Sequence, residues 1–110
     1  MSQPDEDVPF TVHTDERADH LRLLVSGELD LYREGELRTA VSALLADRAP
    51  DRLVLDVCGL QFLDSSGLRA LLHCRDRARS VGVPLTLAVT PGPVTRLLDL
   101  AGVRDWFDYE

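Results

Sequence analysis

The sequence predicts an α/β fold in which a mixed, mostly parallel sheet of four to five strands has helices packed against it. The first observation is that segments with alternating apolar residues take turns with segments whose apolar residues recur about every 3.6 positions. The second is their order, β-β-α-β-α-β-α, because strand–helix–strand units favour parallel strands joined by right-handed crossovers. The third is the length of 110 residues, which suffices for one core. We therefore predict a single domain at residues 8–110, preceded by a polar, acidic and disordered tail at residues 1–7.

Two strands open the predicted domain. Phe10 and Val12 alternate with polar residues, and the segment 21–25 alternates again before Gly27. The charged run 15–19 between them suits an exposed hairpin connection. We expect the first two strands to pair antiparallel, at the start of an otherwise parallel sheet.

A helix and a buried strand follow. The helical period starts at Leu31, with Asp30 in the position of an N-cap and Pro50 as the stop. The next segment, 53–57, is apolar at nearly every position. Because buried parallel strands have this pattern, we expect this strand to be covered on both faces.

The remaining elements alternate regularly. A second helix is predicted over residues 65–79, with Gly82 as the glycine that follows it. A strand at 85–89 and a helix over 93–101 come next, and residues 106–107 are expected to fold back as a short strand or anchor.

Composition excludes several classes of chemistry. The 12 basic residues are all Arg, and the chain contains neither Lys nor Asn. A P-loop lysine, a Schiff-base lysine and a protein-kinase catalytic loop are therefore impossible. The net charge of −7 argues against nucleic acid or anionic lipid as a partner, because binding phosphates requires a basic face.

The sequence contains no clear targeting signal and no cysteine redox motif. No segment approaches the roughly 20 apolar residues of a membrane span, and the acidic N-terminus is unlike a signal peptide. Cys58 and Cys74 have neither zinc-site nor CxxC spacing, so we expect two reduced thiols packed as small apolar side chains. These features together predict a cytoplasmic protein.

The carboxyl ends of the predicted parallel strands place three segments at one rim: residues 27–30, 59–67 and 90–93. The sequence Asp-Ser-Ser-Gly at 64–67 lies where a loop becomes a helix. The first N–H groups of a helix lack intrahelical partners and carry partial positive charge, so a phosphoryl group on a serine there would be stabilised. Gly67, without a side chain, would let a partner or a phosphate approach the backbone. The alternative is that these residues form an ordinary helix N-cap with a structural role alone.

Two catalytic interpretations are weaker. A hydrolase nucleophile elbow has the pattern Gly-x-Ser-x-Gly, and Leu63 stands where its first glycine would be. Asp30, Asp56 and Asp64 lie on or near the rim and are a conceivable Mg²⁺ site, but helix caps and solvated loops explain them as well. We therefore predict no enzyme activity, no metal and no cofactor.

Residues 58–68 resemble the signature of the STAS domain and, more narrowly, that of bacterial anti-sigma factor antagonists. The resemblance includes Gly-Glu-Leu-Asp at 27–30 and a segment at 94–103 that is similar to the third helix of that family. It extends over most of the chain, residues 10–107, and implies a STAS-like fold.

The resemblance implies a partner-switching function. In this family the unphosphorylated antagonist binds an anti-sigma factor, which is itself a serine kinase, and thereby frees a sigma factor. The kinase inactivates the antagonist by phosphorylation, and a PP2C-type phosphatase reverses it. The corresponding phosphoacceptor here is Ser65, and we expect a monomer when free. The resemblance implies a partner-binding role for Asp30, Asp64, Ser66, Gly67 and Leu68.

Two further hypotheses remain open. STAS-like single domains also serve as scaffold subunits of sensory complexes or as components of lipid transport systems. An enzyme or small-ligand binder that uses the acidic rim is the third possibility.

Overall fold

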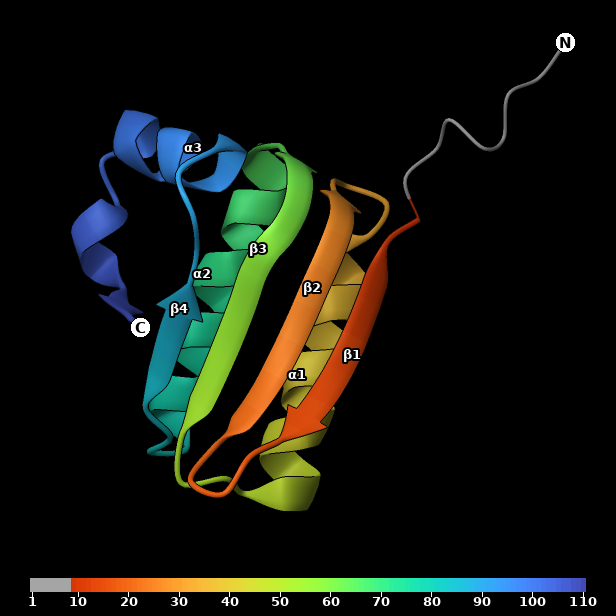
Figure 1. The fold of residues 1–110 in the computed structure, drawn as a ribbon, viewed down its shortest axis with the longest axis vertical. Coiled ribbons are helices and arrows are strands. Elements are labelled where there is room, and N and C mark those ends of the chain that lie inside the picture. Colours follow the sequence, from red (N-terminus) through yellow and green to blue (C-terminus); the bar gives the residue numbers. More distant parts are fainter. Residues whose placement is uncertain (1–8) are drawn as a thin grey trace, which may run out of the picture.

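The computed structural model describes residues 9–110, so the tail predicted at residues 1–7 lies outside the described part of the chain. Five strands form one sheet in the order β1-β2-β3-β4-β5 (Figure 1). β1 is antiparallel to β2, and the pairs from β2 to β5 are parallel. The predicted α/β class and element order are confirmed. The strands are β1 (Thr11–Glu16), β2 (Leu21–Leu29), β3 (Leu53–Leu63), β4 (Leu85–Ala88) and β5 (Asp108–Tyr109).

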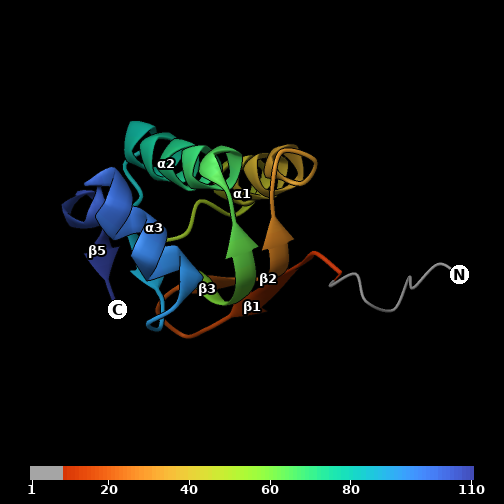
Figure 2. The ribbon, with the colours of Figure 1, turned by 90° about the horizontal axis from the view of Figure 1, so that it is seen from above.

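Two helices, α1 (Glu34–Arg48) and α2 (Ser65–Ser80), lie side by side on one face of the sheet (Figure 2). The shorter helix α3 (Pro93–Ala101) lies across the end of the sheet and contacts β3. A 3₁₀ turn at Arg104–Trp106 leads into β5. The helices therefore leave the other face of the sheet, here called the open face, without a helical cover.

The core lies between the sheet and these helices. Leu23, Leu55 and Leu87 point from three neighbouring strands toward α1 and α2, which contribute Leu37 and Leu71. Each of these five side chains is at most 1% exposed. Burying one leucine of this kind stabilises a fold by about 2 kcal/mol, so this layer is the main source of stability.

β3 is covered on both faces along residues 53–57, as its apolar pattern predicts, but helices lie on only one of these faces (Figure 2). Its apolar run arises because Val54 is fully buried on the open face, where Arg22 of β2 is its register neighbour. Arg22 pairs there with Asp56 at 2.9 Å and with Glu110 at 2.7 Å. Charged side chains, rather than a second layer of helices, cover this part of the sheet.

Three strands are longer than the sequence predicts. β2 continues through Gly27 to Leu29, because Gly27 adopts a φ of +100° at an irregularity in the β2–β3 register. β3 continues to Leu63, and its last residues pair with this second half of β2. The segment 59–63, expected to be a loop, is therefore strand. β1 likewise takes in Asp15 and Glu16, which the sequence predicts in the connection.

Helix α1 starts three residues later than predicted. Asp30 does not cap it: the carboxylate accepts the N–H of Tyr32 at 3.0 Å, and the carbonyl accepts the N–H of Glu34 at 2.9 Å. These bonds form a turn between β2 and the helix. The N-cap position is Arg33, without a side-chain cap.

Candidate functional site

The candidate site lies where β2 and β3 end side by side, at the upper edge of the sheet in Figure 1. Leu29 and Leu63 are register partners, and the chain leaves them into the turn after β2 and into α2. The connection from β4 to α3 lies at the same end of the molecule. The structure thus brings the three predicted rim segments to one edge, as expected for parallel strands.

Asp64 fixes the start of α2. It has extended backbone geometry, with φ −105° and ψ −172°, and its Oδ1 accepts the N–H of Gly67 at 2.9 Å. Its carbonyl accepts the N–H of Leu68 at 2.9 Å, and its own N–H donates to the carbonyl of Leu29 at 3.4 Å. Asp64 is therefore the N-cap that the sequence predicts, and it also connects the helix to β2.

Gly67 is buried against its own chain, which corrects the reason expected for a glycine here. A Cβ at this position would lie 2.4 Å from the carbonyl oxygen of Leu29 and 2.7 Å from Cδ1 of Leu63. The position that a side chain of Gly67 would occupy is thus filled by β2 and β3, so neither a phosphate nor a partner can approach the backbone from there. Leu68 is also buried, at 8% exposed. Gly67 and Leu68 therefore lie buried below the exposed part of the site and help to fix its shape.

The two serines of the motif have different surroundings. Ser65 is the first residue of α2 and is exposed, and within residues 9–110 its hydroxyl makes no hydrogen bond. Ser66 is half-buried and lines a groove between α1 and α2. Because the first N–H groups of a helix have no intrahelical acceptor, both serines lie in a region of partial positive charge.

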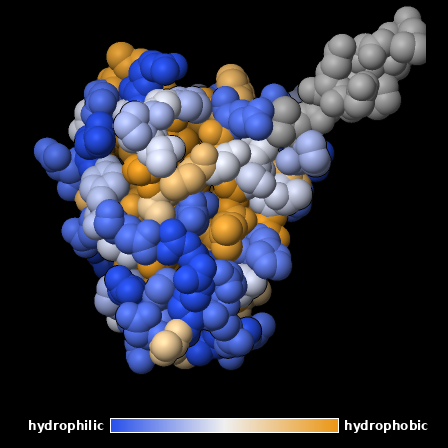
Figure 3. All heavy atoms as spheres, viewed as in Figure 1, coloured by the Kyte–Doolittle hydropathy of each residue, from blue (hydrophilic) through white to orange (hydrophobic). Residues whose placement is uncertain are grey.

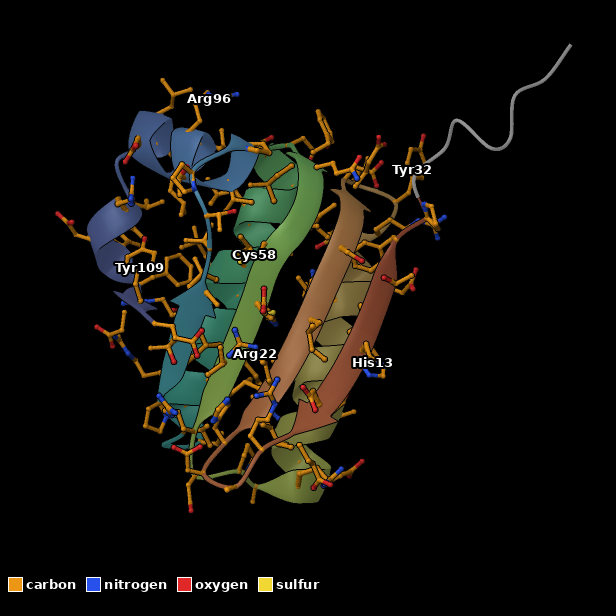
Figure 4. The ribbon with its side chains drawn as sticks, viewed as in Figure 1. His13, Arg22, Tyr32, Cys58, Arg96 and Tyr109 are labelled. Carbon is orange, nitrogen blue, oxygen red and sulfur yellow. The ribbon has the colours of Figure 1, made fainter. Side chains whose placement is uncertain are left out.

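Exposed apolar side chains lie at the same rim as Ser65, and sequence reasoning missed them. Leu31 is 65% exposed, Tyr32 86% and Phe62 46%. Tyr32 projects outward beyond the end of β2 (Figure 4). In Figure 3, hydrophobic atoms are exposed over the middle and upper part of the open face, whereas the lower part is mostly hydrophilic. No local pattern marked them, because Leu31 begins the predicted helical period and Phe62 lies in a segment predicted to be a loop.

The three aspartates considered for Mg²⁺ are not gathered into one site. Asp56 lies on the open face, paired with Arg22. The carboxylates of Asp30 and Asp64 each accept a backbone N–H in separate turns. Within residues 9–110, no cluster of three or more His, Cys, Asp or Glu side chains has an arrangement suited to a metal ion.

Comparisons with known proteins agree on one family. A family model described as "Mlab, STAS domain" matches residues 12–107. An anti-sigma F factor antagonist of Paenibacillus polymyxa is 33% identical over 79 residues, which are 72% of this chain and 68% of that protein.

Solved structures are similar over nearly the whole chain. An anti-sigma factor antagonist from Mycobacterium paratuberculosis matches with a TM-score of 0.79 at 25% identity, covering 99% of this chain and 89% of the other. The anti-sigma factor antagonist SpoIIAA in its unphosphorylated form matches with a TM-score of 0.73 at 19% identity, covering 91% and 88%. Among the helices of residues 9–110, none has the length and apolarity that crossing a bilayer requires.

Proposed function

This chain belongs to the STAS domain family, and we propose that it acts there as an anti-sigma factor antagonist. Its unphosphorylated form binds an anti-sigma factor that is also a serine kinase, and so frees the sigma factor in the cytoplasm. The chain itself catalyses nothing. Phosphorylation of Ser65 switches binding off: the γ-phosphoryl group of ATP forms a bond to Oγ, its bond to ADP breaks, and the hydroxyl proton is released. A PP2C-type phosphatase hydrolyses the ester.

One observation carries this proposal: the exposed Ser65 hydroxyl lies at the start of α2, at the rim where Leu31, Tyr32 and Phe62 are exposed. We name these four residues, with Asp30 and Ser66, the docking rim. Apolar side chains that are solvated in the free chain supply the area that a protein partner buries. The Ser65 hydroxyl at the same rim is exposed, so a kinase can reach it.

Phosphorylation opposes docking through electrostatics. It adds about −1.5 to −2 charges to a face that the partner must desolvate. Burying a charge without a partner costs several kcal/mol, and a loss of about 4 kcal/mol weakens binding about a thousandfold. In the free chain the start of α2 stabilises the phosphate, so the fold itself should change little.

The experiment measures binding of a purified cognate anti-sigma factor to variants at the two ends of α2. Ser65→Asp should bind at least tenfold more weakly than Ser65→Ala. Ser80→Asp, at an exposed serine at the last residue of α2, is the matched control and should bind like the unmodified chain. Incubation with the kinase and ATP should add one phosphate, and Ser65→Ala should not accept it. Equal affinities of the two Ser65 variants would contradict the proposed switch.

A second candidate is a scaffold subunit of a sensory complex or a lipid transport system. The observation that favours it is the description of the matching family model, which does not name an antagonist. Binding to a transporter ATPase or to a large assembly of related domains, without binding to a kinase-type anti-sigma factor, would support this candidate against the first.

A further inference from the structure

A groove of about 160 Å³ lies between α1 and α2, beside the serine motif. On α2, Ser66, Arg69 and His73 follow one another at helical spacing and so share one stripe of that helix. Arg38 faces them from α1. The groove is lined by Leu31, Glu34, Arg38, Ser66, Arg69 and His73.

The charge in this groove is opposite in sign to that of the chain as a whole, whose net charge is −7. Arg38 pairs with Glu34 at 3.1 Å, so the charge of this arginine is already compensated within the groove. Arg69 is exposed, and within residues 9–110 no acidic side chain forms an ion pair with it. The other carboxylate near this end of α2, that of Asp64, accepts the N–H of Gly67. Arg69 is therefore a cation available for an additional anion.

We propose that this groove is an anion site that holds the phosphate group of the phosphorylated serine motif, with Arg69 as the residue that pairs with it. The inference rests on the proposed function, because a kinase must first modify the motif. Ser66 lines the groove and precedes Arg69 by three residues, whereas Ser65 precedes it by four. Both spacings bring side chains together on a helix. Arginine suits this role because its planar guanidinium donates two hydrogen bonds to phosphate oxygens.

Holding the phosphate would change two of its properties. A nearby guanidinium favours the doubly ionised form, so it lowers the second pKa of phosphoserine from its ordinary value of about 6. A phosphate held in the groove is also less accessible to a phosphatase. The antagonist would then recover more slowly from phosphorylation than one without Arg69.

The test uses the full chain with phosphoserine incorporated during synthesis at position 65 or position 66, in separate samples. The phosphate is titrated by ³¹P NMR. Arg69→Gln should raise its pKa by about one unit, and Arg69→Lys should restore most of the lower value. Arg79→Gln, at an exposed arginine near the other end of α2, is the matched control and should leave the pKa unchanged.

A rise at position 65 alone would support the site and assign it to the phosphate of Ser65. A rise at position 66 alone would support it and identify Ser66 as the residue whose phosphate it holds. If the phosphate pKa is the same with and without the Arg69→Gln substitution at both positions, the proposal is overturned. Thermal unfolding of each sample checks that it is folded, and Arg38→Gln provides a second variant of the groove.

This result is independent of the proposed switch. Because the phosphate is incorporated during synthesis, a kinase that fails to modify Ser65 would contradict the proposed function and leave the titration unaffected.

Discussion

Gly67 and Gly35 both lie in the first turn of a helix but have opposite surroundings. A Cβ on Gly67 would clash with the Leu29 carbonyl at 2.4 Å, whereas a Cβ on Gly35 would meet nothing within 4 Å beyond its chain neighbours and the backbone of its own helix. We expect Gly67→Ala to lower the free energy of unfolding by about 2–3 kcal/mol, because backbone must move. Gly35→Ala should raise it by about 0.5–1 kcal/mol through helix propensity. Urea unfolding followed by circular dichroism measures both.

Equal effects of these two substitutions would contradict the close packing of α2 on β2. That packing matters for the proposed function because it fixes the position of Ser65 relative to the sheet. A shifted first turn would move the hydroxyl relative to Tyr32 and Phe62.

The two thiols differ in accessibility, although the sequence predicts that both are packed inside. Cys58 is exposed on the open face of β3, while Cys74 is fully buried in α2. Burial raises the pKa of the Cys74 thiol to about 12. Desolvation and the nearby Asp56 raise the pKa of Cys58, which slows its reaction too.

We therefore expect iodoacetamide at pH 8 to modify the native chain once, at Cys58, and the urea-unfolded chain twice. Intact-mass spectrometry and peptide mapping measure the modification. Native alkylation of Cys74 at the rate of Cys58 would show that α2 opens far more readily than its burial implies.

At the scale of elements, the sequence predicts α2 best because local chemistry marks its start. Asp64 caps the helix as its position suggests. By contrast, Asp30 is equally suitable as a cap but forms a turn with Tyr32 instead, and α1 begins later. The second half of β3 has the local pattern of a loop because its pairing with β2 depends on the register irregularity at Gly27, which no local pattern reveals.

The Asp64 cap can be tested separately from its charge. Asp64→Ala removes the acceptor of the Gly67 N–H and should lower the free energy of unfolding by about 1 kcal/mol. Asp64→Asn keeps an acceptor oxygen and should cost only a small fraction of that. Chemical unfolding measures both variants. If the asparagine variant is as destabilised as the alanine variant, the carboxylate charge, rather than the cap bond, is what stabilises the start of α2.

At the scale of the whole molecule, the ion pairs on the open face could not be predicted from the sequence. They form a charged cover in which Arg22 pairs with Asp56 and with Glu110, which are 34 and 88 residues away from it. The apolar run of β3 gave no sign of it, because Val54 is buried without a helix above it. Only the order of the strands, which is a property of the complete sheet, brings these three side chains together.

This charged cover makes stability depend on pH. Hydrogen bonding to Arg22 holds the pKa of the Glu110 carboxyl below its ordinary value of 4.5, and Arg22 stays protonated throughout. A carboxyl with a lowered pKa in the folded state stabilises the fold above its unfolded pKa, and this contribution is lost as the pH falls through the folded value. Glu110→Gln should therefore be less stable than the unmodified chain at pH 6, with the difference shrinking below about pH 4.5. Urea unfolding at pH 3 to 7 measures it, with Glu36→Gln on the exposed surface of α1 as the control. A difference that stays constant over this range would show that Glu110 stabilises the fold by packing rather than by its charge.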